Sequence, residues 1–385
     1  MHHILVFLFL LSGTANVLLI KWTNTLEAEC NDGKLRFFQH PVFLTMIMFA
    51  GELVCYVIFK CMYCFLRRRG DGSEIVNFFT NGDQDFRPSK MFYPAFLHGI
   101  ASILLFNGLY LTYASSFQMI RSSCIIFVAF ASGIQFNTTL TARHWSAMLS
   151  IALTVFFIII NDLQRIRYDQ NSLSHIDFNA VLSAELMIIC AGAFEGIRMV
   201  YEEKYIKAIN IPLMQAIGWR GIFGLLTTAL WGVGMNYQPA IIPFNDNSRG
   251  VFDDFMDISK QLQSNHWIIV AISIFFIAAA VHGYTGLCIT KFSSSSNLIH
   301  GDCLRTYVVS MMVLLLRWEQ LNFISWLCFI SLQFGIMSYR RAILMEWYRK
   351  ILLRLQRNRY NNMSGDNTRD LDGNAVPTNR QADVI

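Results

Sequence analysis

The chain has 385 residues, of which 54% are hydrophobic and only 15% are charged, and its formal net charge is +5. Soluble domains typically carry about 25% charged residues, so this chain has too little charge to cover a water-facing surface. The composition excludes a disordered protein, a coiled coil and a disulfide-rich secreted module. The small net charge favours a membrane face over nucleic acid, so no nucleic acid is expected as a partner.

Ten segments along the chain are long and apolar enough to be candidate membrane spans, because a spanning helix needs about 20 mostly apolar residues. They cover residues 3–20, 42–66, 93–113, 118–136, 145–161, 179–201, 213–234, 267–287, 297–316 and 322–339. The sixth and the ninth contain charged residues, so a scan by hydropathy alone is expected to report about eight. A cleaved signal peptide is the alternative for the first segment, although no Lys or Arg precedes its apolar run.

Positive charge sets the expected orientation, because cytosolic loops are enriched in Lys and Arg. With ten spans, the Arg67–Arg69 cluster and the basic residues after 338 fall on one side, which places both termini in the cytosol. Residues 340–357 are expected to form a basic amphipathic helix on the membrane surface, and residues 358–385 a disordered tail. Tyr360 and Met363 match a Tyr-x-x-apolar endolysosomal sorting pattern, for which chance is the alternative.

The chain carries a weak internal repeat. The fourth span opens with Ser115–Cys124 and the ninth with Ser293–Cys303, and each is followed by Leu-x-x-x-x-Trp, at Leu140 and at Leu321. In this alignment Gln118, Arg121 and Cys124 match Asn297, His300 and Cys303. We therefore expect an all-α polytopic membrane protein of two five-helix repeats, 1–161 and 177–339, joined by a loop over 162–176. An odd number of spans per repeat makes the two repeats inverted; chance similarity between apolar segments is the alternative.

Several stretches carry a family resemblance over about residues 1–345: ASSFQMIR at 114–121, FQHP at 38–41, MFAGE at 48–52, EEK at 202–204 and Asp302-x-x-Arg305. With these, the chain resembles the drug/metabolite transporter superfamily and, within it, the nucleotide-sugar-transporter-like, EamA-type F branch of solute carrier family 35. The resemblance implies ten helices in inverted repeats and a lysosomal or other endomembrane location. For some relatives it also implies a link to the mitochondrial adenine nucleotide carrier.

Arg121, in the fourth span, is the main candidate for solute binding. A charge at mid-membrane costs about 2.5–3.5 kcal/mol, so such a residue faces a cavity or a partner. Its guanidinium could bind a phosphate or carboxylate, with Gln118 on the same helix face. A structural pair with Glu52 or another carboxylate is the alternative. Ser116 lies at the start of this span, where free N–H groups attract anions or are simply capped.

Other intramembrane polar residues are interpreted in pairs. Asp302 and Arg305, at i, i+3 on the ninth span, can bind solute or pair with each other for a structural or gating role. Asn297 and His300 join them as binding candidates, and His300 can carry a proton or be a buried, hydrogen-bonded histidine. Glu195 and Arg198 form a second such pair in the sixth span. Glu185 lacks a local partner, which suits a protonated coupling residue or a hydrogen bond to another helix.

No catalytic motif, metal site or cofactor site is expected from the sequence, and the chain is not predicted to be an enzyme. The favoured hypothesis is a secondary-active carrier that moves a small anionic or nucleotide-sugar-like solute across an endomembrane by alternating access. A seven-span receptor is one alternative. A membrane adaptor that keeps the carrier fold but acts through protein partners is the other, because fold alone does not fix function.

Overall fold

A computed structural model describes residues 2–69, 82, 85–168, 178–240, 244, 247–319, 322–341 and 345. The expected sorting residues Tyr360 and Met363, the tail over 358–385 and nearly all of the 340–357 segment lie outside the described residues. The helices are α1 (His2–Thr23), α2 (Pro41–Arg69), α4 (Phe92–Leu111), α5 (Ala114–Arg121), α6 (Cys124–Phe136), α7 (Ala142–Tyr168), α8 (Phe178–Ile209), α9 (Leu213–Met235), α10 (Phe255–Ser264), α11 (His266–Phe292) and α12 (Ser295–Leu315). A further helix covers 323–341, and a 3-10 turn, η1 (Pro88–Met91), precedes α4.

Eight of these helical segments are long and apolar enough to cross a membrane, as the sequence predicts for a hydropathy scan. They correspond to the first eight predicted spans and include the sixth, which was expected to be missed. The ninth and tenth predicted spans, which correspond to α12 and the helix over 323–341, are outside this set. Large apolar side chains such as Leu153, Phe157, Leu230 and Ile277 are exposed on the helices. Such a surface fits lipid rather than water, so the chain is a multi-pass membrane protein.

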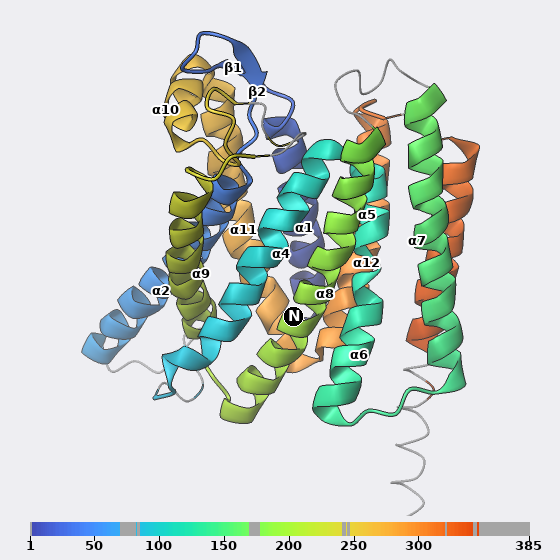
Figure 1. Ribbon diagram of the computed structural model, residues 1–385. Helices are drawn as coiled ribbons and strands as arrows, with labels where there is room; N and C mark the ends of the chain where they lie inside the picture. The colour runs from blue at the N-terminus through green and yellow to red at the C-terminus, as the bar shows by residue number, and fades with distance from the viewer. Residues whose placement is uncertain are drawn as a thin grey trace, which may run out of the picture.

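The long helices lie side by side, and one end of the bundle carries a small cap (Figure 1). The cap consists of α10 and a two-stranded antiparallel sheet, β1 (Glu27–Glu29) and β2 (Leu35–Phe37), in which Glu27 pairs with Phe37. We call this the hairpin end and the other the opposite end. The sequence did not predict the sheet, because strands of three residues leave little periodic signal.

Buried polar contacts join the cap to the bundle. His40 Nδ1 lies 2.6 Å from Asp253 Oδ1, and Asp253 Oδ2 accepts the Val42 backbone N–H at 3.0 Å at the start of α2. His40 and Asp253 are both buried. These bonds connect the β1–β2 hairpin and the start of α2 to the segment that precedes α10.

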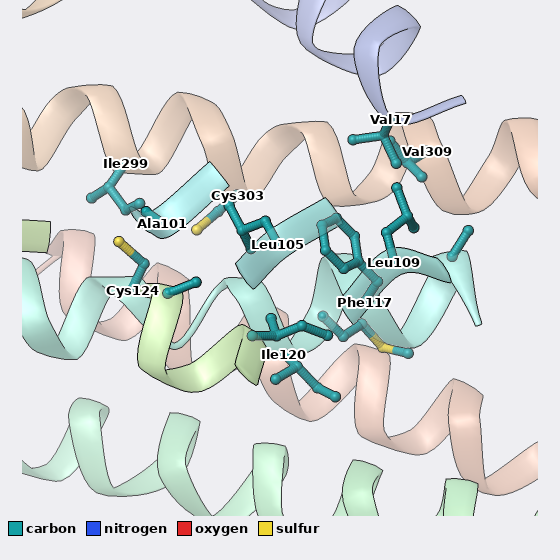
Figure 2. Packing of buried hydrophobic residues seen from close by; sticks show 14 of the residues in the cluster. Val17, Ala101, Leu105, Leu109, Phe117, Ile120, Cys124, Ile299, Cys303 and Val309 are labelled. Atoms are coloured by element: carbon teal, nitrogen blue, oxygen red, sulfur yellow. The ribbon is translucent and has the colours of Figure 1, made fainter. Parts of the chain in front are cut away.

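The core lies between α1, α4, α5, α6, α8, α11 and α12. Figure 2 shows part of this cluster, where buried side chains of α1, α4, α5, α6 and α12 pack together. The main helix pairs are α2 with α9, α4 with α8 and α1 with α11. Small residues bring α2 and α9 together: a Cβ on Gly221 would lie 2.7 Å from the Leu53 backbone nitrogen and 2.9 Å from the Phe49 carbonyl oxygen.

The fourth predicted span is two helices rather than one. The Ser122 and Ser123 N–H groups bond to the carbonyl groups of Met119 and Ile120, three residues earlier, which tightens the chain between α5 and α6. Arg121 is therefore the last residue of α5, at a break within the bundle.

Candidate functional site: a charged cavity between the helices

A cavity of about 90 Å³ lies between the helices of the bundle. Residues of α1, α2, α4, α5, α8, α9, α11 and α12 line it. Most of the wall is apolar, from side chains such as Phe9, Val17, Leu105 and Phe275, and charged groups stand at a few places on it. A mostly apolar wall with a few polar groups is typical of sites for small molecules.

One side of the cavity is formed by a closed ring of six buried or half-buried side chains, which we call the charged ring: Glu52, Arg220, Glu202, Arg198, Glu195 and His98. Glu202 is its central acceptor, since Oε1 accepts from Arg220 Nη1 at 2.8 Å and Oε2 accepts from Arg198 Nη1 at 2.5 Å. Four helices, α2, α4, α8 and α9, contribute to it.

The ring closes through the two outer carboxylates. Arg220 Nε donates to Glu52 Oε2 at 3.0 Å, and Arg198 Nε donates to Glu195 Oε2 at 2.9 Å. His98 lies between these carboxylates, with Nδ1 3.4 Å from Glu195 and Nε2 3.9 Å from Glu52. Breaking any one link would leave two buried groups with one partner each instead of two, which is costly at this depth.

The other side of the cavity holds what we call the Asp302 cluster: Arg121, Asp302, Arg305 and His282. Asp302 lies 3.3 Å from Arg121 Nε and 2.7 Å from Arg305 Nη2. Arg305 Nη1 lies 3.4 Å from His282 Nε2, and His282 Nδ1 lies 3.3 Å from the Phe9 carbonyl oxygen. Because a carbonyl only accepts and a guanidinium only donates, His282 is neutral with its proton on Nδ1.

The two clusters carry opposite formal charge. Among the described residues, the charged ring has three carboxylates and two guanidiniums, and the Asp302 cluster has two guanidiniums and one carboxylate. With neutral histidines these sum to −1 and +1, so the eight charges cancel while the cavity stays polarised. A solute with an anionic group would meet the positive side, and its hydrogen-bond donors or a cationic group would meet the negative side.

Arg121 and His98 are more open than the carboxylates and the other guanidiniums of these clusters. Each is 15% exposed, whereas those groups are at most 6% exposed; His282 is half-buried. The ion pair with Asp302 uses Nε, at one edge of the Arg121 guanidinium. Both Arg121 and His98 line the cavity, so a guanidinium and an imidazole are available to a bound molecule.

The predicted pairs and the structure agree in part. The Asp302–Arg305 and Glu195–Arg198 pairs are both present. Arg121 pairs with Asp302 rather than with Glu52, whose partner is Arg220.

The remaining candidates lie away from this cavity or outside the described side chains. Ser116, Gln118 and Glu185 are buried, outside the lining of the cavity as the structure describes it. Asn297 and His300 lie in α12, but their side chains are outside the described residues.

Four residues of the site were not predicted from the sequence: Arg220, Glu202, His98 and His282. The signal was available for Arg220, a formal charge inside the seventh predicted span, since such residues face a partner or a cavity. His98 and His282 likewise lie within the third and eighth predicted spans. Which carboxylate each one meets depends on helix packing, which the spacing along one helix does not reveal.

Similarity to known proteins decides the family. The human protein named solute carrier family 35 member F6 is 31% identical over 373 residues, covering 97% of this chain and 96% of that protein. The chain belongs to the F branch of solute carrier family 35. The mouse protein of the same name is 30% identical over 363 residues, covering 93% of this chain and 94% of that protein. An uncharacterized Schizosaccharomyces pombe protein is 25% identical over 338 residues.

The fold of this family 35 chain is also shared with a solved structure. One crystal structure superposes with a TM-score of 0.52 at 11% identity, covering 88% of this chain and 96% of the other chain. At that identity the likeness concerns the fold alone. No family model matches the chain.

Proposed function

We propose that this chain is a secondary-active carrier that moves a small anionic or nucleotide-sugar-like solute across an endomembrane by alternating access. The observation that carries the proposal is the polarised cavity, whose lining includes both the Arg121 guanidinium and the imidazole of His98. The anionic group of the solute binds at Arg121 and Arg305, where two guanidiniums share one carboxylate. Sugar hydroxyls or an amino group then reach the charged ring on the other side.

Helix pairing supports two inverted five-helix repeats, with ten spanning helices in all. In this arrangement α1 corresponds to α8, α2 to α9, α4 to α11, and α5 with α6 to α12. Exchanging the two repeats turns the helix pair α4–α8 into α11–α1 and the helix pair α2–α11 into α9–α4. All four of these helix pairs are in contact. The pair α2–α9 maps onto itself, as expected for two helices at a pseudo-two-fold axis.

Matching contacts at the two ends of the bundle support the same repeat. Near the hairpin end Lys21 Nζ donates to the Thr112 carbonyl oxygen at 2.7 Å, two residues before α5 begins. Near the opposite end Lys207 Nζ donates to the Ser293 carbonyl oxygen at 2.5 Å, two residues before α12 begins. Lys21 and Lys207 each lie two residues before the end of their helix, α1 and α8.

A carboxylate then caps each following helix. Glu319 accepts from the Ser115 N–H at 3.2 Å and from its hydroxyl at 2.5 Å, at the start of α5. Glu203 accepts from the Ser295 N–H at 2.7 Å and from its hydroxyl at 2.5 Å, at the start of α12. We infer that these are the two gates of the carrier, each of which opens when its carboxylate releases the serine.

The membrane and its sidedness follow from charge and family. The Arg67–Arg69 end of α2 lies toward the opposite end of the bundle (Figure 1). We assign that end to the cytosol together with both termini, because the sequence after residue 338 is also basic. A lysosomal or other endomembrane location follows from the family resemblance.

Counterflow into proteoliposomes tests the carrier function. Full-length protein is loaded with one member of a panel of nucleotide sugars, nucleotides, amino acids or small peptides, and uptake of the labelled compound is followed. Arg121→Ala should abolish uptake, and Arg121→Lys, which keeps the charge but not the two-pronged geometry, should retain a small fraction. Arg143→Ala is the control, because Arg143 is exposed on the surface.

Two results would overturn the assignment at different levels. Uptake by Arg121→Ala equal to that of the wild type would remove Arg121 from the binding site. A folded wild-type protein that exchanges no compound on the panel would favour the adaptor hypothesis. Its partners would then be sought by crosslinking, beginning with the mitochondrial adenine nucleotide carrier that the resemblance implies.

A further inference from the structure

A second polar site lies apart from the central cavity, where α5, α7 and α8 meet near the hairpin end. Its centre is a pair of carboxyl groups, Asp162 of α7 and Glu185 of α8, and both residues have 0% exposure. The two carboxyl groups interact with each other, and the Ser116 hydroxyl lies beside Asp162. Neither residue lines the cavity in the part of the chain that the structure describes.

The pair is short of hydrogen-bond donors, although the Ser116 hydroxyl is one donor to Asp162. In the described part of the chain, both oxygens of Glu185 and Oδ2 of Asp162 have no N–H or O–H partner. Asp162 Oδ1 is the fourth oxygen, and Asn161 Nδ2 approaches it at 3.5 Å. Two ionised carboxylates side by side with so few donors repel each other and lose their hydration. A proton shared between them removes the repulsion and supplies the missing donor.

Other titratable and charged groups face the pair from every element packed around it. Arg165, on α7, lies over the Tyr113 ring at 4.0 Å and attracts Asp162. Glu319, the carboxylate that caps α5, repels it. Cys328, on the helix over 323–341, also lies within electrostatic range of Asp162. Lys21 of α1 in turn attracts Glu319. Among the described residues, two cations therefore face three carboxyl groups, which leaves room for one further positive charge.

We propose that Asp162 and Glu185 form a proton-binding site that couples the hairpin-end gate to pH. With the proton in place the two carboxyl groups hold α7 and α8 together while Glu319 caps α5. When the proton leaves to water, both carboxyl groups are ionised. Asp162 and Glu185 then repel each other, and both repel Glu319. Release of the proton thereby favours separation of α5, α7 and α8 at the hairpin end. This inference deepens the proposed carrier function and names a proton as the second ligand.

Infrared difference spectroscopy tests proton binding without any solute. Full-length protein in lipid nanodiscs is titrated from acidic to alkaline buffer, and the carbonyl band of a protonated carboxylic acid is followed. The band should disappear on alkalinisation in the wild type and be lost in both Asp162→Asn and Glu185→Gln. Glu29→Gln is the control, because Glu29 pairs with Lys260 at the surface, away from the pair and from the two gates.

The outcomes separate this inference from the carrier function. A titrating band that persists in both variants, or its absence from the wild type, would overturn the proton site. The second readout is the pH dependence of counterflow: the wild-type rate should change across the same titration, and Glu185→Gln should give a flat profile whatever its absolute rate. A wild type with counterflow but no pH dependence would overturn the coupling and leave the carrier intact. A wild type without counterflow would count against the carrier, and the infrared result would then decide the proton site by itself.

Discussion

Arg220 of α9 binds both carboxylate oxygens of Glu52 of α2 through Nε and Nη2, one edge of its guanidinium, across 168 positions of sequence. Both side chains are buried, with 4% and 1% exposure. The contact joins α2 and α9, the two helices that the proposed pseudo-two-fold axis would exchange. It therefore stabilises the middle of the bundle rather than either end. Its loss should affect stability before it affects any single conformation.

Neutralising one member of this pair should destabilise the protein strongly. Glu52→Gln leaves Arg220 with a single carboxylate partner, Glu202, and a loss of about 3–5 kcal/mol is expected for breaking a buried ion pair. Thermal unfolding in detergent micelles measures it. Glu29→Gln is the control, since the Glu29–Lys260 pair at 2.8 Å is largely exposed and should contribute less than about 1 kcal/mol. Equal losses in the two variants would contradict the ring as a stabilising unit.

Enlarging Gly221 should disturb the same helix contact by a different route. A Cβ at this position meets backbone atoms of α2, which cannot move aside as a side chain can. Overpacking of this kind costs about 1–3 kcal/mol, so Gly221→Ala should lower the unfolding temperature. Gly234→Ala, in the same helix with nothing within 4 Å of the new Cβ, should be neutral or stabilising. A neutral Gly221→Ala would show that α2 and α9 lie farther apart in the membrane.

The two capping carboxylates should control access from opposite ends. Glu319→Gln weakens the cap on α5, and Glu203→Gln weakens the cap on α12. A charge-assisted hydrogen bond contributes about 1.5–3 kcal/mol, so each variant should shift the open population by at least about tenfold. A cysteine at Ser102, which lines the cavity, is labelled with a membrane-impermeant thiol reagent added from one side. Faster labelling from the same side in both variants would refute gates at opposite ends.

The cap at the hairpin end should tolerate moderately acidic conditions. Burial opposes ionisation of Asp254, but hydrogen bonds from Arg249, Ser248 and the Met256 N–H outweigh it and lower the pKa of this carboxyl below its usual value. A lowered folded-state pKa means that the stabilisation is complete above the unfolded value of about 3.9 and is lost as pH falls through the folded value.

Hydrogen exchange measured over residues 236–265 checks this expectation. Protection should stay constant from neutral pH down to about pH 4 and fall below it. Asp254→Ala removes the side-chain cap of α10 and should cost about 1 kcal/mol at neutral pH, with a flatter acid response. Protection that falls already between pH 7 and pH 5 would mean that another group, and not Asp254, controls the cap.

Local spacing predicted part of the site, and helix packing determined the rest. Asp302–Arg305 and Glu195–Arg198 follow from i, i+3 spacing on one helix, so the sequence alone places each pair. Glu52–Arg220 and Arg121–Asp302 join residues far apart in the chain, and composition cannot say which helices meet. The break after Arg121 was also invisible, because serines occur both inside helices and at their ends.

Cancellation of the eight cavity charges has an electrical consequence. A reorienting carrier whose own charges sum to zero moves no net protein charge through the membrane field, which acts with about 2.3 kcal/mol per elementary charge for each 100 mV. Membrane voltage then acts only on what is carried. A monoanion crossing alone would generate current. A monoanion crossing with the one proton proposed for Asp162 and Glu185 would be electrically silent, and the concentration differences of the solute and of protons would drive it.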